Sequence, residues 1–136
     1  MRPVLVLILI LAAPLYAYPA VIHVPKDYLT IQEAIDAASQ GDTVIAAAGT
    51  YVERIDFLGK AIAVTSSAGS ETTVIDGSKM GSVVTMKTGE GPDSIITGFT
   101  ITNGKAEEGG GIFCESSSPT IRDNVITLND LSLIHI

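Results

Sequence analysis

The sequence predicts an all-β protein: a right-handed parallel β-helix, a solenoid of about four coils, with a short N-terminal capping helix. Three observations predict this fold. Short runs of β-branched residues follow one another from Thr43 onward, separated by Gly, Asp, Asn and Ser. Apolar positions recur every 20–25 residues, which indicates a coil that returns to the same place on each turn. One segment alone has helical periodicity, and it precedes these strands.

The composition limits the class of protein. The chain has 136 residues, with 15 acidic and 8 basic side chains, a formal charge of -7 and one cysteine, Cys114. This length allows one domain or a piece of one. A single cysteine excludes a disulfide scaffold and a cysteine-only zinc site. The basic residues are scattered, so we expect no nucleic-acid partner.

The first 17 residues have the pattern of a secretory signal peptide. Arg2 gives a positive start, residues 4–11 are an unbroken apolar run, and small residues close the segment at Ala17. The apolar run is shorter than the roughly 20 residues that cross a bilayer. We expect cleavage after Ala17, with Ala20 as the alternative position and an uncleaved anchor as the rival interpretation. The predicted protein is therefore exported, secreted or cell-surface, with no membrane span after cleavage.

Residues 22–41 are predicted to form an N-terminal cap, with a helix over 31–39. Thr30 and Glu33 have the capping-box spacing, in which Glu33 reaches back to the Thr30 amide. Four apolar residues then share one helical face: Ile31, Ala34, Ile35 and Ala38. Gly41 is suited to the left-handed backbone that ends a helix. Such a helix can cover the open strand edges of a first coil.

The coils are predicted over residues 42–130, from two interleaved series of strands. The first series is Ile55-Asp56, Ile75-Asp76, Thr97-Gly98 and Arg122-Asp123. The second is Val44, Ile62, Val83 and Ile112. Within the first series, Ile121 and Ile126 repeat Ile96 and Ile101. Asn103, Asn124 and Asn129 are expected at coil corners, where asparagine tolerates left-handed backbone and can stack in amide ladders.

A small β-sandwich is the rival architecture. It would need hairpin turns, longer strands and strict alternation of apolar and polar residues. Asp76-Gly77 is the one strong hairpin dipeptide in the chain. The solenoid also explains the N-terminal helix as a cover, and it is therefore our prediction.

The segments that carry this pattern resemble a known superfamily. They are 31–38 (IQEAIDAA), 41–44 (GDTV), 49–53 (GTYVE), 95–104 (IITGFTITNG), 109–114 (GGGIFC) and 117–124 (SSPTIRDN). The chain resembles an N-terminal fragment of the pectate-lyase-like β-helix superfamily, in its uncharacterised secreted bacterial branch. The resemblance covers residues 22–130 and implies the fold. It implies carbohydrate as a ligand class, but fold does not fix function.

The resemblance transfers no catalytic residue to this chain. Lyases of this superfamily use clustered aspartates with calcium and a basic residue, and its esterases use two aspartates with an arginine. The later acidic residues here are Asp76, Glu90, Asp93, Glu107, Glu108, Asp123 and Asp130. Arg122 is the one arginine beyond the first coil, and Thr100 and Thr102 stand where a carboxylate would be sought. We therefore predict no catalytic or cofactor-binding residue and no cofactor, and leave the metal site unknown.

Several residues have both a functional and a plain interpretation. Asp76 and Asp123 fall on equivalent repeat positions, so they could bind calcium together or simply cap turns. Glu107 and Glu108 lie in the longest loop and face either a ligand or solvent. The remaining candidates are Cys114 as a small core residue, Tyr51 as a sugar platform or packed side chain, and His23 and His135 without partner motifs. A calcium-stabilised solenoid is disfavoured, because dense Gly-Asp periodicity is absent.

Residues 131–136 break the repeat, so we predict a non-native or disordered tail and a β-helix truncated at its C-terminal end. Two functions follow. The first is a non-catalytic solenoid that contacts polysaccharide, a cell-surface glycan or another surface. The alternative is the N-terminal part of a polysaccharide lyase or pectin esterase whose active coils lie elsewhere. For this chain as written we expect no catalysis.

Overall fold

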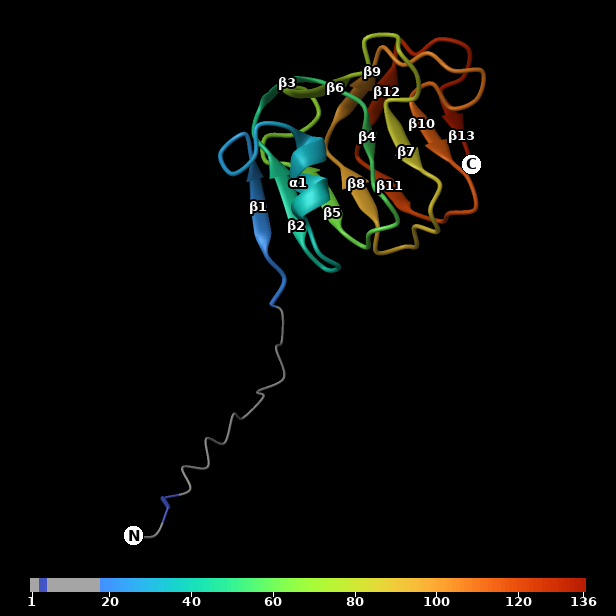
Figure 1. Cartoon of the computed structure of the whole chain (residues 1–136). Helices are drawn as coiled ribbons and strands as arrows, with labels where there is room; N and C mark the ends of the chain where they lie inside the picture. The colour runs from blue at the N-terminus through green and yellow to red at the C-terminus, as the bar shows by residue number, and fades with distance from the viewer. Residues whose placement is uncertain (1–2, 5–17) are drawn as a thin grey trace.

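The computed structural model describes residues 3–4 and 18–136, and these fold into a β-solenoid with one short helix (Figure 1). The predicted signal peptide, residues 1–17, lies outside the described residues except at positions 3 and 4. Every strand pair in the three sheets is parallel, which excludes the β-sandwich, since that fold is built from antiparallel hairpins. Asp76-Gly77 accordingly opens a corner loop and not a hairpin.

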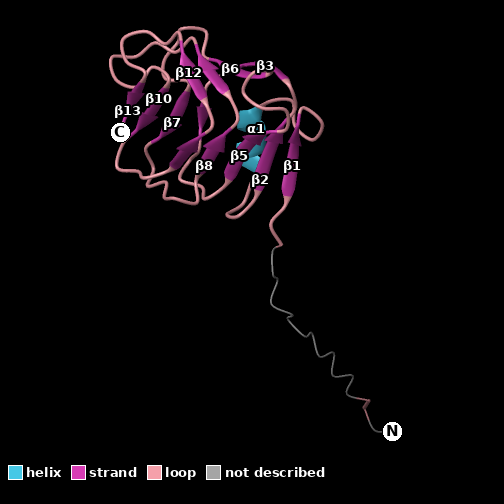
Figure 2. Cartoon of the chain, turned by 180° about the vertical axis from the view of Figure 1, so that it is seen from behind, coloured by secondary structure: helices cyan, strands magenta, loops and turns pink. Residues whose placement is uncertain are grey.

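The largest sheet, called sheet A, has five strands in the order β1-β2-β5-β8-β11. Their bounds are Val21–Val24, Thr43–Ala46, Ala63–Ser66, Ile95–Thr97 and Thr120–Arg122. Figure 2 shows β1, β2, β5 and β8 side by side. β1 adds a strand ahead of the four coils, so the solenoid makes about five turns on this side.

The other two sheets have four strands each. Sheet B contains β3 (Gly49–Val52), β6 (Thr73–Asp76), β9 (Thr100–Thr102) and β12 (Val125–Thr127). Sheet C contains β4 (Ile55–Asp56), β7 (Val84–Met86), β10 (Ile112–Cys114) and β13 (Ile134–His135). The chain visits sheets A, B and C in turn, so each complete coil has three strands.

The prediction of two strand series is therefore wrong in detail. Ile55 lies in sheet C and Ile75 in sheet B, while Val44 pairs with Val64 and not with Ile62. Corner loops differ in length between coils, so a constant spacing in sequence drifts from one sheet to another. The late repeat is confirmed, because Ile121 pairs with Ile96 and Ile126 with Ile101, where the corners have equal length.

The core consists of inward side chains stacked from coil to coil. Val44, Val64 and Ile96 form one such stack under sheet A, and Ile75 and Ile101 form another under sheet B. All five are fully buried. Burial of each such aliphatic side chain stabilises the fold by about 2 kcal/mol, so these stacks are the main favourable term.

Helix α1 (Ile31–Ala37) closes the N-terminal end of this core with buried Ile31, Ala34 and Ile35. Thr30 is the N-cap and accepts a hydrogen bond from Glu33 N at 3.1 Å, as predicted. The other half of the predicted capping box is not found among the described residues, since the Glu33 carboxylate does not accept from the Thr30 amide. The helix ends at Ala37 and not at residue 39, because the backbone of Ala38 is already extended. Gly41 has a left-handed φ of +91°, but it does not end the helix as predicted, because the C-cap is Ala38.

The remaining contacts of α1 come from the first coil. Glu53 accepts hydrogen bonds from Ile31 N and Gln32 N, at 3.0 and 2.9 Å. At the other end, Lys60 Nζ donates to the carbonyls of Ile35, Asp36 and Ala38, each at 2.8 Å. A negative group at the helix N-terminus and a positive group at its C-terminus both suit the helix dipole.

Gln32 extends sheet C beyond its edge strand β4. Its side-chain oxygen accepts from Asp56 N at 2.7 Å, and its side-chain nitrogen donates to Asp56 O at 3.1 Å. A single glutamine thus satisfies both main-chain groups that a neighbouring strand would otherwise pair. The helix protects an exposed strand edge in this way.

Two corners are held by asparagines that bind the preceding coil. Asn124 binds Phe99 N and Ile96 O, both at 3.0 Å, and Asn129 binds Gly104 N at 2.7 Å. These are side-chain to backbone bonds and not the predicted amide ladder. Asn103 has the predicted left-handed backbone, with φ of +56°. At the next coil the left-handed residues are instead Asp123 and Leu128.

The C-terminal hexapeptide continues the solenoid. β13 pairs in parallel with β10, with Ile134 beside Ile112 and His135 beside Phe113. The expectation of disorder therefore does not hold for Ile134 and His135, since both complete a three-strand coil. The non-native origin of residues 131–136 stays a prediction.

Candidate functional site

The outer side of sheet A is the widest regular surface of the described residues. Strand alternation places ten side chains on it, in two rows across the five strands. The first row is Val21, Thr43, Ala63, Ile95 and Thr120, and the second is His23, Ile45, Thr65, Thr97 and Arg122. We call these ten residues the sheet A face. All of them are exposed or partly exposed.

The sheet A face contains no acidic side chain, although the chain has 15 acidic residues. Its charged or chargeable groups are His23 on the first strand and Arg122 on the last. Because the net charge of the chain is -7, an acidic ligand is repelled by most other surfaces. Electrostatics therefore favours this face for an acidic ligand, while a neutral ligand is neither attracted nor repelled by the net charge.

Threonine hydroxyls on the face are available to a ligand. Within the part of the chain that the structure describes, Thr43 and Thr97 hydroxyls make no hydrogen bond. Thr65 makes one long contact, to Ser66 O at 3.4 Å, while Thr120 is engaged by Pro92 O at 2.7 Å. Methyl groups of the threonines and of Ile45 lie between these hydroxyls. The face thus offers hydrogen-bonding and apolar groups at the strand spacing of about 4.8 Å.

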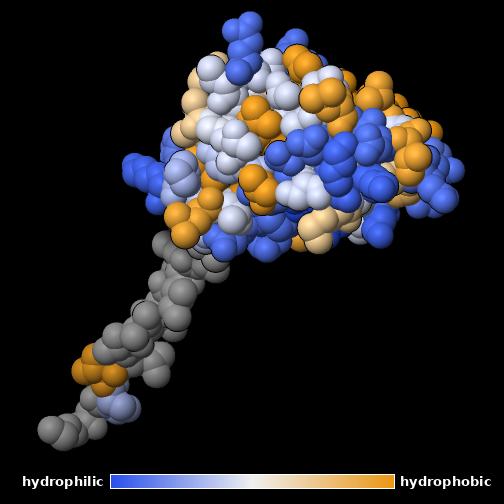
Figure 3. Space-filling model, turned by 90° about the horizontal axis from the view of Figure 1, so that it is seen from above, coloured by the Kyte–Doolittle hydropathy of each residue, from blue (hydrophilic) through white to orange (hydrophobic). Residues whose placement is uncertain are grey.

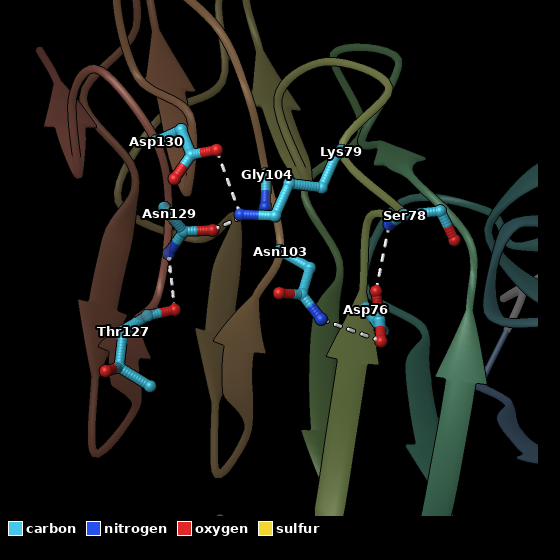
Figure 4. Close-up of polar contacts among 8 residues, drawn as sticks. All are labelled: Asp76, Ser78, Lys79, Asn103, Gly104, Thr127, Asn129 and Asp130. Atoms are coloured by element: carbon cyan, nitrogen blue, oxygen red, sulfur yellow. Dashed lines mark hydrogen bonds and ion pairs between the residues drawn. The ribbon is translucent and has the colours of Figure 1, made fainter.

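The loops that join sheets B and C form a second candidate region. They are residues 77–83, 103–111 and 128–133, and they stack at one corner. Figure 4 shows that Lys79 reaches across the third coil to Asp130, at 2.9 Å. Figure 3, which views the molecule from above, shows hydrophilic and hydrophobic residues interspersed on this side. Both partners of this ion pair are about half-exposed, so it contributes little stability.

Asp76 and Asp123 do not lie together, which corrects the prediction that they occupy equivalent positions. Asp76 ends β6 in sheet B and pairs in register with Thr102. Asp123 follows β11 at the corner between sheets A and B, beside Gly98. Asp76 accepts from Ser78 N at 2.9 Å and from Asn103 Nδ2 at 3.0 Å, so it caps a turn.

Glu107 and Glu108 are exposed in the loop before β10. Glu108 lies 3.6 Å from His135 Nδ1, and the His135 ring stacks on Phe113 with centroids 5.3 Å apart. These rings lie along the solenoid axis on neighbouring strands β10 and β13. Within the described residues 3–4 and 18–136, no group of three or more His, Cys, Asp or Glu side chains could hold a metal ion.

Glu90 is a buried carboxylate that joins three coils. It accepts hydrogen bonds from Gly59 N at 3.0 Å, from Thr88 N at 3.0 Å and from Ser117 Oγ at 3.3 Å. Only 2% of Glu90 is exposed, so these donors replace its water. Because every donor is supplied by the solenoid itself, Glu90 is a structural tie and not a ligand-facing group.

Cys114 and Tyr51 also point inward. Burial, and then the nearby Glu90, raise the pKa of the Cys114 thiol, which disfavours the reactive thiolate. Tyr51 packs against the core and donates to Ala47 O at 2.7 Å. Burial, and then Glu53, raise the pKa of Tyr51. Both residues therefore have a packing role.

Other predicted residues are dispersed. His23 is exposed on β1, and its backbone N donates to Asp27 at 2.7 Å. Asp93 is exposed in the turn before β8, whereas Arg122 is exposed at the opposite end of the neighbouring parallel strand β11. Thr100 donates to Ser70 O at 2.7 Å. The Thr102 hydroxyl is buried, with no hydrogen-bond partner among the described residues.

The sheet A face cannot be recognised as a unit in the amino-acid sequence. Its residues are spread from position 21 to position 122, and they align only when the strand register is known. Alternation of polar and apolar residues is clear in β11, where Thr120 and Arg122 flank Ile121, but not in β2, where the outward residue Ile45 is itself apolar. Alternation shows which residues point outward, but it does not show to which of the three sheets a strand belongs. It therefore does not show which outward residues share a face.

Comparison with known proteins gives one family. A family model described as protein of unknown function (DUF1565) matches residues 56–133, more than half of the chain. No curated protein matches the sequence. Among residues 3–4 and 18–136, no helix is both long and apolar enough to span a membrane.

Proposed function

The chain belongs to the DUF1565 family of proteins of unknown function, and on that premise we propose that it is an exported, non-catalytic solenoid whose sheet A face binds an extended carbohydrate. The family match and the parallel sheets make it a β-solenoid repeat protein. The observation that carries the proposal is a five-stranded face without acidic side chains on a chain of net charge -7.

The chemistry of the face suits a sugar chain. Carbohydrates present hydroxyls and apolar C–H surfaces in alternation, and Thr43, Thr65 and Thr97 present hydroxyls beside methyl groups. An extended polysaccharide running along the solenoid axis would meet a new strand about every 4.8 Å. Arg122 at one end adds a group that can bind a carboxylate of an acidic sugar.

Binding can be tested by electrophoresis through gels that contain a polysaccharide. We expect retardation of the wild-type chain in polygalacturonate or in a neutral β-glucan. Thr97→Glu places a carboxylate on β8, the fourth of the five strands of the sheet A face, and should remove the retardation. Thr127→Glu makes the same change on the outer side of sheet B and is the matched control. Retardation that Thr97→Glu and Thr127→Glu reduce equally would refute this site.

The alternative enzyme function has its own readout. Polygalacturonate incubated with the chain should show no unsaturated product, and methylated pectin should release no methanol. Appearance of either product would favour the lyase or esterase alternative and would contradict a non-catalytic protein. Membership of the pectate-lyase-like superfamily is part of the same proposal, and the IQEAIDAA and GDTV segments support it.

Export is proposed from residues 1–17. The positive start, the apolar run over residues 4–11 and the small residues up to Ala17 support it. Expression of the full chain in a bacterial host followed by N-terminal sequencing tests it. We expect a mature protein that starts at Tyr18, or at Val21 if the alternative position is used. Retention of Met1 in the cytoplasmic fraction would overturn the proposal.

A further inference from the structure

Asn103 and Gly104 form the one Asn-Gly dipeptide in the chain. In such a dipeptide the glycine backbone nitrogen can attack the asparagine side-chain amide, because glycine has no side chain to obstruct the approach. The reaction needs a free glycine N–H and an asparagine side chain that can turn toward it. The structure controls both of these requirements.

The Gly104 N–H is held by the next coil. It donates to Asn129 Oδ1 at 2.7 Å, and Gly104 is buried. Asn129 is itself fixed, since its Nδ2 donates to the carbonyls of Ile101 and Thr127, both at 3.0 Å. The nucleophile of the reaction is thus engaged by a side chain of the fourth coil.

The Asn103 side chain is held by the preceding coil. Its Nδ2 donates to Asp76 Oδ2 at 3.0 Å, and its backbone carbonyl accepts from Lys79 N at 2.7 Å. Figure 4 shows the Asn103 amide directed toward Asp76 and the Gly104 nitrogen toward Asn129, on opposite sides. The two reacting groups are therefore held apart by two different coils.

We propose that Asn103 is a latent deamidation site, which Asn129 and Asp76 keep unreactive until the fourth coil opens. In the open state Gly104 N bonds to Asn103 Cγ, its proton passes through solvent to the side-chain nitrogen, and the bond from Cγ to that nitrogen breaks, so that it leaves as ammonia. The product is a five-membered succinimide. Water then opens the ring at one of its two carbonyls, giving aspartate or isoaspartate at position 103, and no other reactant is needed.

Deamidation would keep the corner from closing again. The new carboxylate would face Asp76 Oδ2 where an N–H donor stood, so attraction becomes repulsion between like charges. Among the other charges in these corner loops, Lys79 and Asp130 already pair with each other at 2.9 Å. Lys105, whose backbone bridges to Asp130, and the exposed Glu107 and Glu108 lie further along the same loop as Asn103. The isoaspartate product also lengthens the main chain at a residue with left-handed φ. Once Asn103 is deamidated, the corner therefore does not return to its closed arrangement.

Peptide mapping by mass spectrometry tests the proposal on the full chain at neutral pH. The Asn103 peptide is followed for loss of ammonia and gain of water. We expect Asn129→Ala to deamidate roughly tenfold faster than wild type, because Gly104 N–H no longer has a buried bond to break. Asn124→Ala is the matched control, since it removes the same kind of tie one corner away and leaves Asn129 in place.

Equal acceleration by Asn124→Ala and Asn129→Ala would overturn the proposal, because global loosening would then explain the rate. The wild-type chain provides a test that needs no variant. Deamidation in native buffer should be far slower than in urea, and the Gly104 amide should exchange slowly with solvent. A native rate equal to the rate in urea would contradict protection by the fold.

Discussion

The Glu53 carboxylate accepts the backbone N–H of Gln32 at 2.9 Å, and in this way the first coil caps the helix that covers it. Its second oxygen accepts from Ile31 N at 3.0 Å. The Gln32 side chain returns the contact by pairing with both main-chain groups of Asp56. The cap is thus attached by reciprocal polar bonds as well as by its buried apolar face.

Glu53→Ala should destabilise the fold by about 1 kcal/mol, the usual cost of losing a helix cap. The reason is that Ile31 N and Gln32 N lose their acceptor while the helix stays in place. Urea denaturation followed by circular dichroism measures the change. Glu71→Ala is the control, because Glu71 is exposed and makes no hydrogen bond with the described residues. Equal loss in both variants would contradict capping by Glu53.

Glu90→Gln should destabilise the fold by about 2 kcal/mol, because an amide N–H₂ would face N–H or O–H donors. The affected donors are Gly59 N, Thr88 N and Ser117 Oγ, which belong to three successive coils. Comparison of urea midpoints with Glu115→Gln gives the test, since Glu115 is an exposed glutamate near the same corner. If the urea midpoints of Glu90→Gln and Glu115→Gln both equal that of wild type, the Glu90 carboxylate does not stabilise the contact between the coils.

Asp42 should make stability depend on pH. Hydrogen bonds from Ser39 N and Ala20 N, with a smaller contribution from Lys60, hold the pKa of Asp42 below its usual 3.8. A carboxylate with a lowered folded-state pKa stabilises the fold fully above pH 3.8. This stabilisation is lost as pH falls through the folded-state value.

Thermal melts of wild type and Asp42→Asn therefore should differ most near neutral pH. The gap between the two melting temperatures should narrow as pH falls below 3.8, because Asp42 then binds a proton in the unfolded chain first, and in the folded chain only at its lower folded-state pKa. Asp36→Asn is a control on the exposed side of α1. If the difference between the two melting temperatures is constant from neutral to acid pH, the negative charge of Asp42 does not contribute to stability.

Cys114 should react with iodoacetamide only when the solenoid unfolds. The side chain is 1% exposed, and its raised pKa leaves little thiolate at neutral pH. Mass spectrometry after labelling in native buffer and in urea measures the difference. Rapid labelling in native buffer would contradict the buried position. Cys114→Ser should lower the free energy of unfolding, because it places a hydroxyl in an apolar stack.

Much of the fold follows from local pattern. Thr30 caps α1 as expected, and Ile121 lies over Ile96 as the late repeat predicts. Such features depend on residues close in sequence or on equal corner lengths. The prediction for the early coils is less accurate, because Ile55 and Ile75, expected in one series of strands, belong to different sheets. Insertions in corner loops change the spacing without changing the register of the strands.

The candidate site was much less predictable than the fold. Asp76 and Asp123 share a motif in the sequence but occupy different corners of the coil. Thr43 and Thr97, which share no motif, lie in the same sheet with their hydroxyls on one face. Proximity across coils is fixed by main-chain pairing, and residue type alone does not reveal that pairing.

The amino-acid sequence by itself determined the parallel solenoid, the cap helix and the predicted export signal, because each depends on periodicity or composition within a short window. Tertiary structure decided that Glu53, and not Glu33, completes the helix cap, and that Asn129 holds the Gly104 N–H. Both contacts join residues more than twenty positions apart. They form only when stacking brings one coil onto another.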